Sequence, residues 1–202
     1  MTCRQSLIVA ASFFLLAPVP AFPQEAGTIT GKIENRWHSR DPEKYAILVY
    51  VAEAPGDFQP PATPPVVDQI EKVYVPHVLA VVRGTTVTFR NSDSIEHNTF
   101  SPSGDGFDLG NWMQGEERQH QFEKLGVHAI LCKLHPEMSA FVIILQNPYF
   151  AWVDKDGSFT IPNVPAGSYE LKVWGEKIKD LDQTESVEVP GSGAATVEWD
   201  VR

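Results

Sequence analysis

The chain is poor in sulfur and in positive charge. Its 202 residues include two cysteines and three methionines, and 16 lysines and arginines stand against 26 aspartates and glutamates. The resulting net charge of −10 argues against nucleic acid or an anionic membrane surface as a partner. It favours solubility and basic partners instead.

A hydrophobic run long enough to span a bilayer is also missing. Arg4 is the only charged residue before an apolar run from Leu7 to Leu16, and small residues at Val19 and Ala21 are typical of cleavage after Ala21. We therefore predict that residues 1–23 are a secretory signal peptide. The mature protein is then expected to be periplasmic or secreted, without membrane insertion.

Removal of this peptide changes the cysteine count. Cys3 is lost, so Cys132 is the only cysteine of the mature chain and has no intramolecular disulfide partner, although the compartment favours disulfides. A single thiol in a secreted protein indicates a specific role. Arg4 is lost as well, so 15 positive residues remain against 26 negative ones, a net charge of −11.

Sustained helical periodicity is absent. Short segments alternate between apolar and polar residues, and turn signals such as "RNSD", "SPSGDG" and "PGSG" separate them. The alternating segments are "TITGKI", "ILVYVA", "TTVTF", "AFVIIL", "SFTI", "YELKVW", "SVEV" and "ATVEWDV". The pattern predicts an all-β chain of antiparallel sandwiches with Greek-key connections.

Two breaks divide this β pattern. The segment from Ala54 to Pro65 has five prolines and is predicted to be an extended connector, because proline cannot donate the hydrogen bonds of a central strand. A second boundary is expected near Asn147. We predict a middle domain at residues 62–147, flanked by residues 27–58 and 148–202.

The middle block contains a thiol, two imidazoles and a thioether at short spacings. "CKLHPEM" places Cys132, His135 and Met138 three residues apart, and His97 precedes Cys132 by 35 residues. This combination suits copper that alternates between two oxidation states, because sulfur holds Cu(I) and imidazole accepts Cu(II).

Other interpretations of these residues stay open. A buried cysteine often acts as a small hydrophobe, and methionine often fills gaps in a core. Zinc binds cysteine and histidine too, but structural zinc sites rarely accept methionine and usually include a second cysteine.

The remaining histidines and one methionine receive separate predictions. His128 lies four residues before Cys132 in a strand, about 13 Å away, which is too far to share a metal. Met113 is a fallback axial ligand, and His77 is a candidate for a functional role. We expect His120 to be a solvated strand residue.

Residues 70–145 resemble a cupredoxin, the type 1 blue copper fold of plastocyanin and amicyanin. The matching stretches are "VYVPHVLAVVRGTTVTFRNSDSIEHNTF" and "CKLHPEM", which has the C-x2-H-x2-M spacing of amicyanin. The resemblance implies one type 1 copper ion, with His97, Cys132 and His135 as ligands and Met138 as the axial ligand. It also implies that the backbone N–H of Asn98 bonds the thiolate, and that electrons leave through His135 in an apolar surface patch.

The C-terminal segment resembles the carboxypeptidase regulatory-like, transthyretin-like β-sandwich. That family shows an Asp-x-x-Gly-x-Phe hairpin followed by Pro-x-Gly-x-Tyr. The matching residues here are Asp154, Gly157, Phe159, Pro165, Gly167 and Tyr169. We expect residues 27–58 and 148–202 to form one such sandwich with the cupredoxin inserted between its strands.

These resemblances imply an electron carrier and not an enzyme. The layout resembles proteins labelled as methylamine-utilisation proteins, which implies a dehydrogenase or a c-type cytochrome as redox partner. The chain lacks the paired histidine motifs that a copper oxidase or nitrite reductase needs for further copper centres. Two alternatives are a copper carrier or scavenger without electron transfer, and a recognition module with an incidental thiol.

Overall fold

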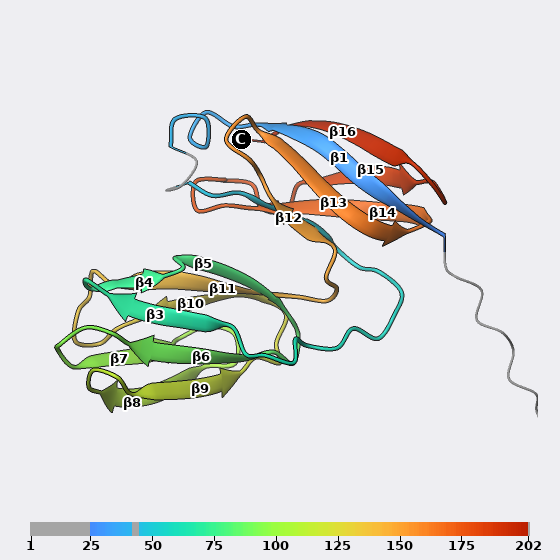
Figure 1. The fold of residues 1–202 in the computed structure, drawn as a ribbon. Helices are drawn as coiled ribbons and strands as arrows, with labels where there is room; N and C mark the ends of the chain where they lie inside the picture. Colours follow the sequence, from blue (N-terminus) through green and yellow to red (C-terminus); the bar gives the residue numbers. More distant parts are fainter. Residues whose placement is uncertain (1–24, 42–44, 202) are drawn as a thin grey trace, which may run out of the picture.

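The computed structural model describes residues 25–41 and 45–201, and the predicted signal peptide lies outside them. Within these residues the chain has sixteen strands and no helix, so the all-β prediction is confirmed. No helix in this part of the chain is long and apolar enough to cross a membrane. The strands form two sandwiches, one above the other in Figure 1.

The first and last parts of the chain build the outer sandwich, which has two sheets ordered β13-β1-β16 and β12-β2-β14-β15. Its strands are β1 (Ala26–Glu34), β2 (Leu48–Val51), β12 (Phe150–Trp152), β13 (Ser158–Pro165), β14 (Gly167–Trp174), β15 (Thr184–Val189) and β16 (Ala194–Asp200). Both N-terminal strands pair with C-terminal ones: β1 lies between β13 and β16, and β2 lies between β12 and β14.

The middle of the chain builds the inner sandwich, whose sheets are ordered β5-β11-β10-β7-β8 and β4-β3-β6-β9. Its strands are β3 (Val66–Ile70), β4 (Val73–Val75), β5 (Val78–Val82), β6 (Thr86–Asn91), β7 (His97–Ser101), β8 (Phe107–Trp112), β9 (Glu117–Gln121), β10 (Gly126–Leu131) and β11 (Ser139–Leu145). Parallel pairs β3–β6 and β5–β11 occur among antiparallel ones. The proline-rich segment before β3 is irregular, as predicted.

Strand β11 is buried on both faces, which explains why "AFVIIL" is continuously apolar instead of alternating. Ala140, Val142 and Ile144 point into the core of the inner sandwich. Ile143 and Leu145 point the other way and pack against Leu48, Trp174 and their neighbours. The outer face of the inner sandwich is therefore joined to the outer sandwich by a hydrophobic contact.

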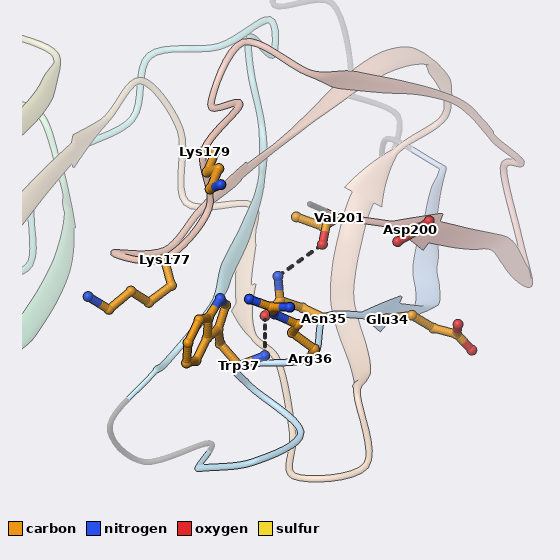
Figure 2. A pocket seen from close by; sticks show the side chains of 8 residues that line it. All are labelled: Glu34, Asn35, Arg36, Trp37, Lys177, Lys179, Asp200 and Val201. Atoms are coloured by element: carbon orange, nitrogen blue, oxygen red, sulfur yellow. Dashed lines mark hydrogen bonds between the residues drawn. The ribbon is translucent and has the colours of Figure 1, made fainter.

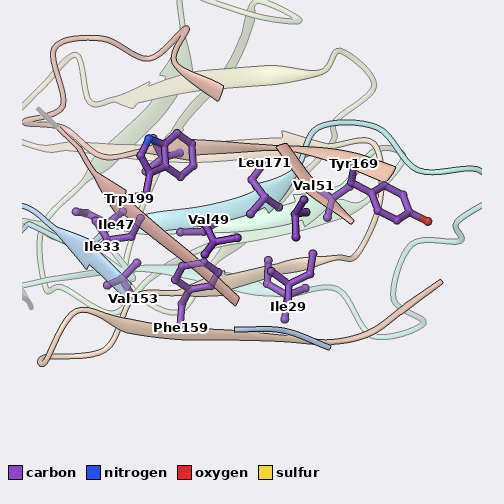
Figure 3. Packing of buried hydrophobic residues seen from close by; sticks show 14 of the residues in the cluster. Ile29, Ile33, Ile47, Val49, Val51, Val153, Phe159, Tyr169, Leu171 and Trp199 are labelled. Atoms are coloured by element: carbon purple, nitrogen blue, oxygen red, sulfur yellow. The ribbon is translucent and has the colours of Figure 1, made fainter. Parts of the chain in front are cut away.

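The outer sandwich has a separate core between its two sheets. Figure 3 shows aliphatic side chains of β1 and β2 packed against the rings of Phe159 and Trp199. In β16, Val197, Trp199 and Val201 at its end are buried while Glu198 and Asp200 are exposed, as the alternation predicts.

We predict that Trp174→Ala lowers the free energy of unfolding by about 3–5 kcal/mol, because it removes a large buried ring from the contact between the sandwiches. Trp174 is 5% exposed and lies 5.1 Å from the ring of Phe141. Urea denaturation followed by circular dichroism measures the change. Trp152→Ala is the control: Trp152 is 38% exposed, and its loss is expected to cost about 0.5 kcal/mol or less. Equal effects of the two substitutions would contradict the proposed contact.

Candidate metal centre

The sequence-predicted ligands lie where three strands begin or end. His97 is the first residue of β7, Cys132 follows the last residue of β10, and Met138 precedes the first residue of β11. Strands β7 and β10 are paired through Phe100 and Leu131, so His97 and Cys132 reach the same end of the sheet. Figure 1 shows the β6–β7 and β10–β11 connections at this end.

The ligating atoms of His97, Cys132 and His135 all lie within 4.8 Å of one another. The Cys132 Sγ to His135 Nδ1 distance is 3.8 Å, and the two imidazole centroids are 4.7 Å apart. Two ligands about 2.0 Å and about 2.3 Å from one metal ion lie roughly 3.5–3.9 Å apart at bond angles near 110–130°. The spacing of the thiol and the second imidazole therefore matches two ligands of one ion.

Met138 belongs to the same buried region. Its side chain is 1% exposed and shares the core cluster with Cys132, and its backbone N–H donates to the carbonyl of His135 at 2.9 Å. This hydrogen bond closes the loop from Cys132 to Met138 into a tight turn. Met113, the alternative axial ligand, is 51% exposed.

Asp93 determines which nitrogen of His97 is available. The Asp93 Oδ2 atom lies 2.8 Å from His97 Nε2. An ionised carboxylate only accepts hydrogen bonds, so Nε2 carries a proton, and in the neutral imidazole the lone pair is on Nδ1. His97 is fully buried, and its Nδ1 has no hydrogen-bond partner in the described structure.

Asp93 is itself held by the turn between β3 and β4. The backbone N–H groups of Glu71 and Lys72 donate to its two oxygens at 2.6 and 2.9 Å. Both turn residues have positive φ angles, 53° and 60°, which a two-residue hairpin of the I′ type requires. Burial acts to raise the pKa of Asp93, but the hydrogen bonds from Lys72, His97 and Glu71 together lower it below its usual value.

Asn98 connects the thiol to the surrounding backbone. Its N–H donates to Cys132 Sγ at 3.5 Å, as the cupredoxin resemblance implies. Its side-chain Oδ1 accepts from the N–H of Lys133 at 3.3 Å, and its carbonyl oxygen lies 3.1 Å from the hydroxyl of Tyr74. Burial raises the pKa of Tyr74 to about 12, so this hydroxyl stays protonated and able to donate.

The side chain of Asn98 is hydrogen-bonded to an ion pair. The Asn98 Nδ2 group donates to Asp108 Oδ1 and to the carbonyl of Gly110, each at 2.8 Å. The other carboxylate oxygen of Asp108 pairs with the ammonium of Lys133. The hydrogen bond from Lys133, followed by those from Gly110 and Asn98, lowers the pKa of Asp108 to about 2.

His135 is the ligand nearest to solvent, being half-buried while His97 and Cys132 are buried. Three exposed apolar residues come from the adjoining loops: Ile95, Met113 and Leu134. Asn91 ties two of these loops together, because its Nδ2 donates to the carbonyls of Ile95 and Trp112 at 2.8 and 3.0 Å. We call these three residues the apolar rim.

The structure corrects the prediction for His120. Its ring is half-buried and stacks on Phe107 with centroids 3.9 Å apart, facing the core instead of solvent. Burial lowers its pKa. His128 is buried and bonds the carbonyl of Lys124 at 2.7 Å. His77 lies outside the centre, with its Nε2 3.2 Å from Glu176 Oε2 on the outer sandwich.

Sequence reasoning missed the roles of Asp93 and Asp108. Asp93 lies four residues before His97 in "NSDSIEH", and its N–H donates to Asn91 Oδ1 at 2.9 Å, a local pattern typical of an Asx turn. That pattern predicts a turn and no contact with a ligand. No sequence pattern indicates the contact of Asp108 with Asn98. The contact depends on the register shift between β7 and β8, which cannot be read from residue spacing.

The residues fit a copper ion. A buried imidazole nitrogen without a partner is costly unless something binds it. His97 Nδ1 is such an atom. His97 also belongs to the group that contains a buried thiol and a second imidazole. This is a donor set of mixed sulfur and nitrogen. Met138 is buried in the same core cluster as Cys132, and its thioether stays the predicted axial ligand.

Comparison with protein families gives one match, to the family described as polysaccharide lyase family 4, domain II, over residues 136–197. The match spans 62 of the 202 residues, from the loop that contains Met138 to β16. A search of curated proteins finds no match. The carboxypeptidase regulatory-like resemblance of these strands stays a prediction.

Among solved structures the chain is similar to cupredoxins over part of its length. A purple cupredoxin from Nitrosopumilus maritimus is 28% identical, with 40% of this chain and 98% of that one covered and a TM-score of 0.38. A reduced amicyanin variant is 23% identical, with 43% and 91% covered and a TM-score of 0.39. A copper-containing nitrite reductase from Thermus scotoductus is 24% identical, with 47% and 25% covered and a TM-score of 0.39.

We predict that Lys133→Gln raises the pKa of Asp108 from about 2 toward its ordinary value of 3.8, because it removes the largest cause of the shift. A folded pKa below the unfolded one means that Asp108 stabilises the native state fully above pH 3.8, and that this contribution is lost as the pH falls toward 2. Carboxyl carbon NMR during an acid titration measures the pKa directly. Lys124→Gln, on another loop, is the control and leaves the titration unchanged; an unchanged titration in Lys133→Gln would refute the ion pair.

Proposed function

We propose that the protein is a type 1 copper protein that carries single electrons between redox partners. The observation that supports this most directly is the group of His97, Cys132 and His135, whose ligand atoms lie within 4.8 Å of one another. The buried Nδ1 of His97, which has no hydrogen-bond partner among the described residues, adds to it. A copper ion bound there would supply one-electron chemistry between Cu(II) and Cu(I).

Residues that are not themselves ligands hold the ligands in position. Asp93 orients His97, and the N–H of Asn98 points at the Cys132 sulfur. A hydrogen bond to a thiolate withdraws negative charge from sulfur and adjusts the redox potential. Because these hydrogen bonds hold His97 and Cys132 in position, little rearrangement accompanies a change of charge, and this favours fast electron transfer.

His135 provides the route to the surface. It is the ligand that solvent reaches, while His97 and Cys132 are buried. The apolar rim supplies contact area that a partner can desolvate. We propose that electrons pass through His135 to a partner seated on this rim.

The charge of the chain supports a basic partner. With 26 acidic against 16 basic residues, its field attracts a basic c-type cytochrome or a dehydrogenase with a basic face. Association is then expected to weaken as salt screens the charges.

We propose a periplasmic or secreted location and an electron carrier that is not itself an enzyme. We also propose that the outer sandwich is a carboxypeptidase regulatory-like domain, at residues 27–58 and 148–202, that hosts the copper domain at 62–147.

Spectroscopy of the copper-loaded protein tests the proposal. The mature protein is loaded with Cu(II), and its visible and electron paramagnetic resonance spectra are recorded. We predict an intense blue or purple thiolate-to-copper band, and the loss of this band in Cys132→Ser, because serine cannot donate charge as a thiolate does. A loaded protein without this band would contradict the electron-transfer proposal.

Met138→Leu is the matched variant for the axial ligand. It keeps the volume of the buried side chain and removes the sulfur, so the band is expected to persist while the reduction potential shifts. Loss of copper in this variant would show that Met138 is needed for binding. A colourless protein that binds only Cu(I) would indicate the copper carrier instead, and no copper binding at all would indicate the recognition module.

A further inference from the structure

The outer sandwich has a cavity of its own, distinct from the metal centre. Its volume is about 330 Å³, and its lining comes from three segments: the chain after β1, the β14–β15 connection and the end of β16. Figure 2 shows these segments meeting around Asn35 and Val201. The volume equals that of roughly ten water molecules. A phosphate ion would fill only part of this space, whereas a monosaccharide would fill most of it.

Three cations line this cavity in a chain that is strongly acidic overall. They are Arg36, Lys177 and Lys179. None of the three forms an ion pair with a residue that the structure describes. Unpaired cations at a concave surface create a local positive potential that attracts an anionic group.

The wall beside these cations is aromatic. The guanidinium of Arg36 lies 4.8 Å from the centroid of the Trp37 ring, a cation–π contact that positions it. Tyr45 packs edge-on against the same ring at 5.8 Å. Trp37 is half-buried and its backbone N–H is already bonded to Asn35 Oδ1, so the indole ring is the part of this residue that a ligand can contact.

The loop that presents Trp37 is already fixed. Asn35 Oδ1 accepts from the N–H groups of Trp37 and His38 at 3.0 and 3.1 Å, and Asn35 Nδ2 donates to the carbonyl of Val201 at 2.9 Å. Asn35 is buried and all these hydrogen bonds are internal. The backbone that presents Trp37 is therefore already in place before a ligand enters, and this lowers the entropic cost of binding.

The cavity has acidic side chains on one side and basic side chains on the other. Figure 2 shows Glu34 and Asp200 on one side, and Trp37 and Lys177 on the other. The basic side suits a carboxylate, and the carboxylate of Glu34 suits hydroxyl groups that donate to it. A ligand with a carboxylate at one end and hydroxyl groups on a ring matches both sides.

We propose that this cavity binds a sugar acid of the uronate type. The carboxylate of the sugar lies toward Arg36 and Lys177, and its hydroxyl groups lie toward Glu34. The indole N–H of Trp37 donates to one of the oxygens. The proposal involves none of the metal ligands, so it stands or fails independently of the proposed electron transfer.

Binding of D-glucuronate to the full chain tests this proposal by isothermal titration calorimetry, with and without added copper. Saturable one-to-one binding with a millimolar dissociation constant is expected, becoming weaker as the salt concentration rises. Arg36→Gln and Lys177→Gln are each expected to weaken binding about fivefold, since one exposed charge pair contributes up to about 1 kcal/mol. Trp37→Phe keeps the aromatic ring, removes the donor, and weakens binding by a similar factor.

Two ligands and one variant serve as controls. D-glucose lacks the carboxylate and is expected not to bind, and inorganic phosphate lacks the ring and is expected to bind at least tenfold more weakly than glucuronate. Lys124→Gln removes a lysine on the inner sandwich and leaves the affinity unchanged. The proposal is overturned if glucuronate does not saturate, if glucose or phosphate binds as tightly, or if Arg36→Gln binds as well as Lys124→Gln. The circular dichroism spectrum and the urea midpoint are expected to stay the same in all these variants, which shows that they are folded.

Discussion

The hydrogen bond between Asp93 and His97 Nε2 is the constraint from which the proposed centre follows. It places the imidazole proton on one nitrogen and leaves the other without a partner, buried beside the thiol of Cys132. Such an arrangement is unfavourable in a protein that binds nothing there. Because Asp93 is held in turn by the β3–β4 hairpin, the availability of this nitrogen depends on a neighbouring sheet and not on the ligand loop alone.

The rest of the inner sandwich limits how far the ligands can move. Asn98 joins the thiol to β8 through Asp108 and to β4 through Tyr74, so a shift of Cys132 would disturb several strands at once. On its other face, β11 packs against the outer sandwich, which stiffens the strand that follows Met138. The cavity around Trp37 lies on the outer sandwich and shares no residue with the metal centre.

The sequence predicted the all-β class, the strands whose residues alternate, the proline-rich connector and the grouping of His97, Cys132 and His135, because alternation, turn residues and ligand spacing are local features. The role of Met138 stays a prediction. It placed His120 in solvent, since period-2 alternation does not say which face is buried when both faces carry polar residues; the ring in fact stacks on Phe107. The pairing of Asp108 with Lys133 depends on a register shift that no spacing reveals. The cavity around Trp37 depends on contacts between residues more than 100 positions apart.

X-ray absorption at the copper edge, recorded on the same loaded sample in its oxidised and its reduced state, tests the central claim that this scaffold holds one fixed thiolate–imidazole copper centre. The account predicts one short copper–sulfur distance and two copper–nitrogen distances in both states, with small changes between them because the ligands are already in place. A centre with only oxygen and nitrogen neighbours, or one that loses a ligand on reduction, would contradict it.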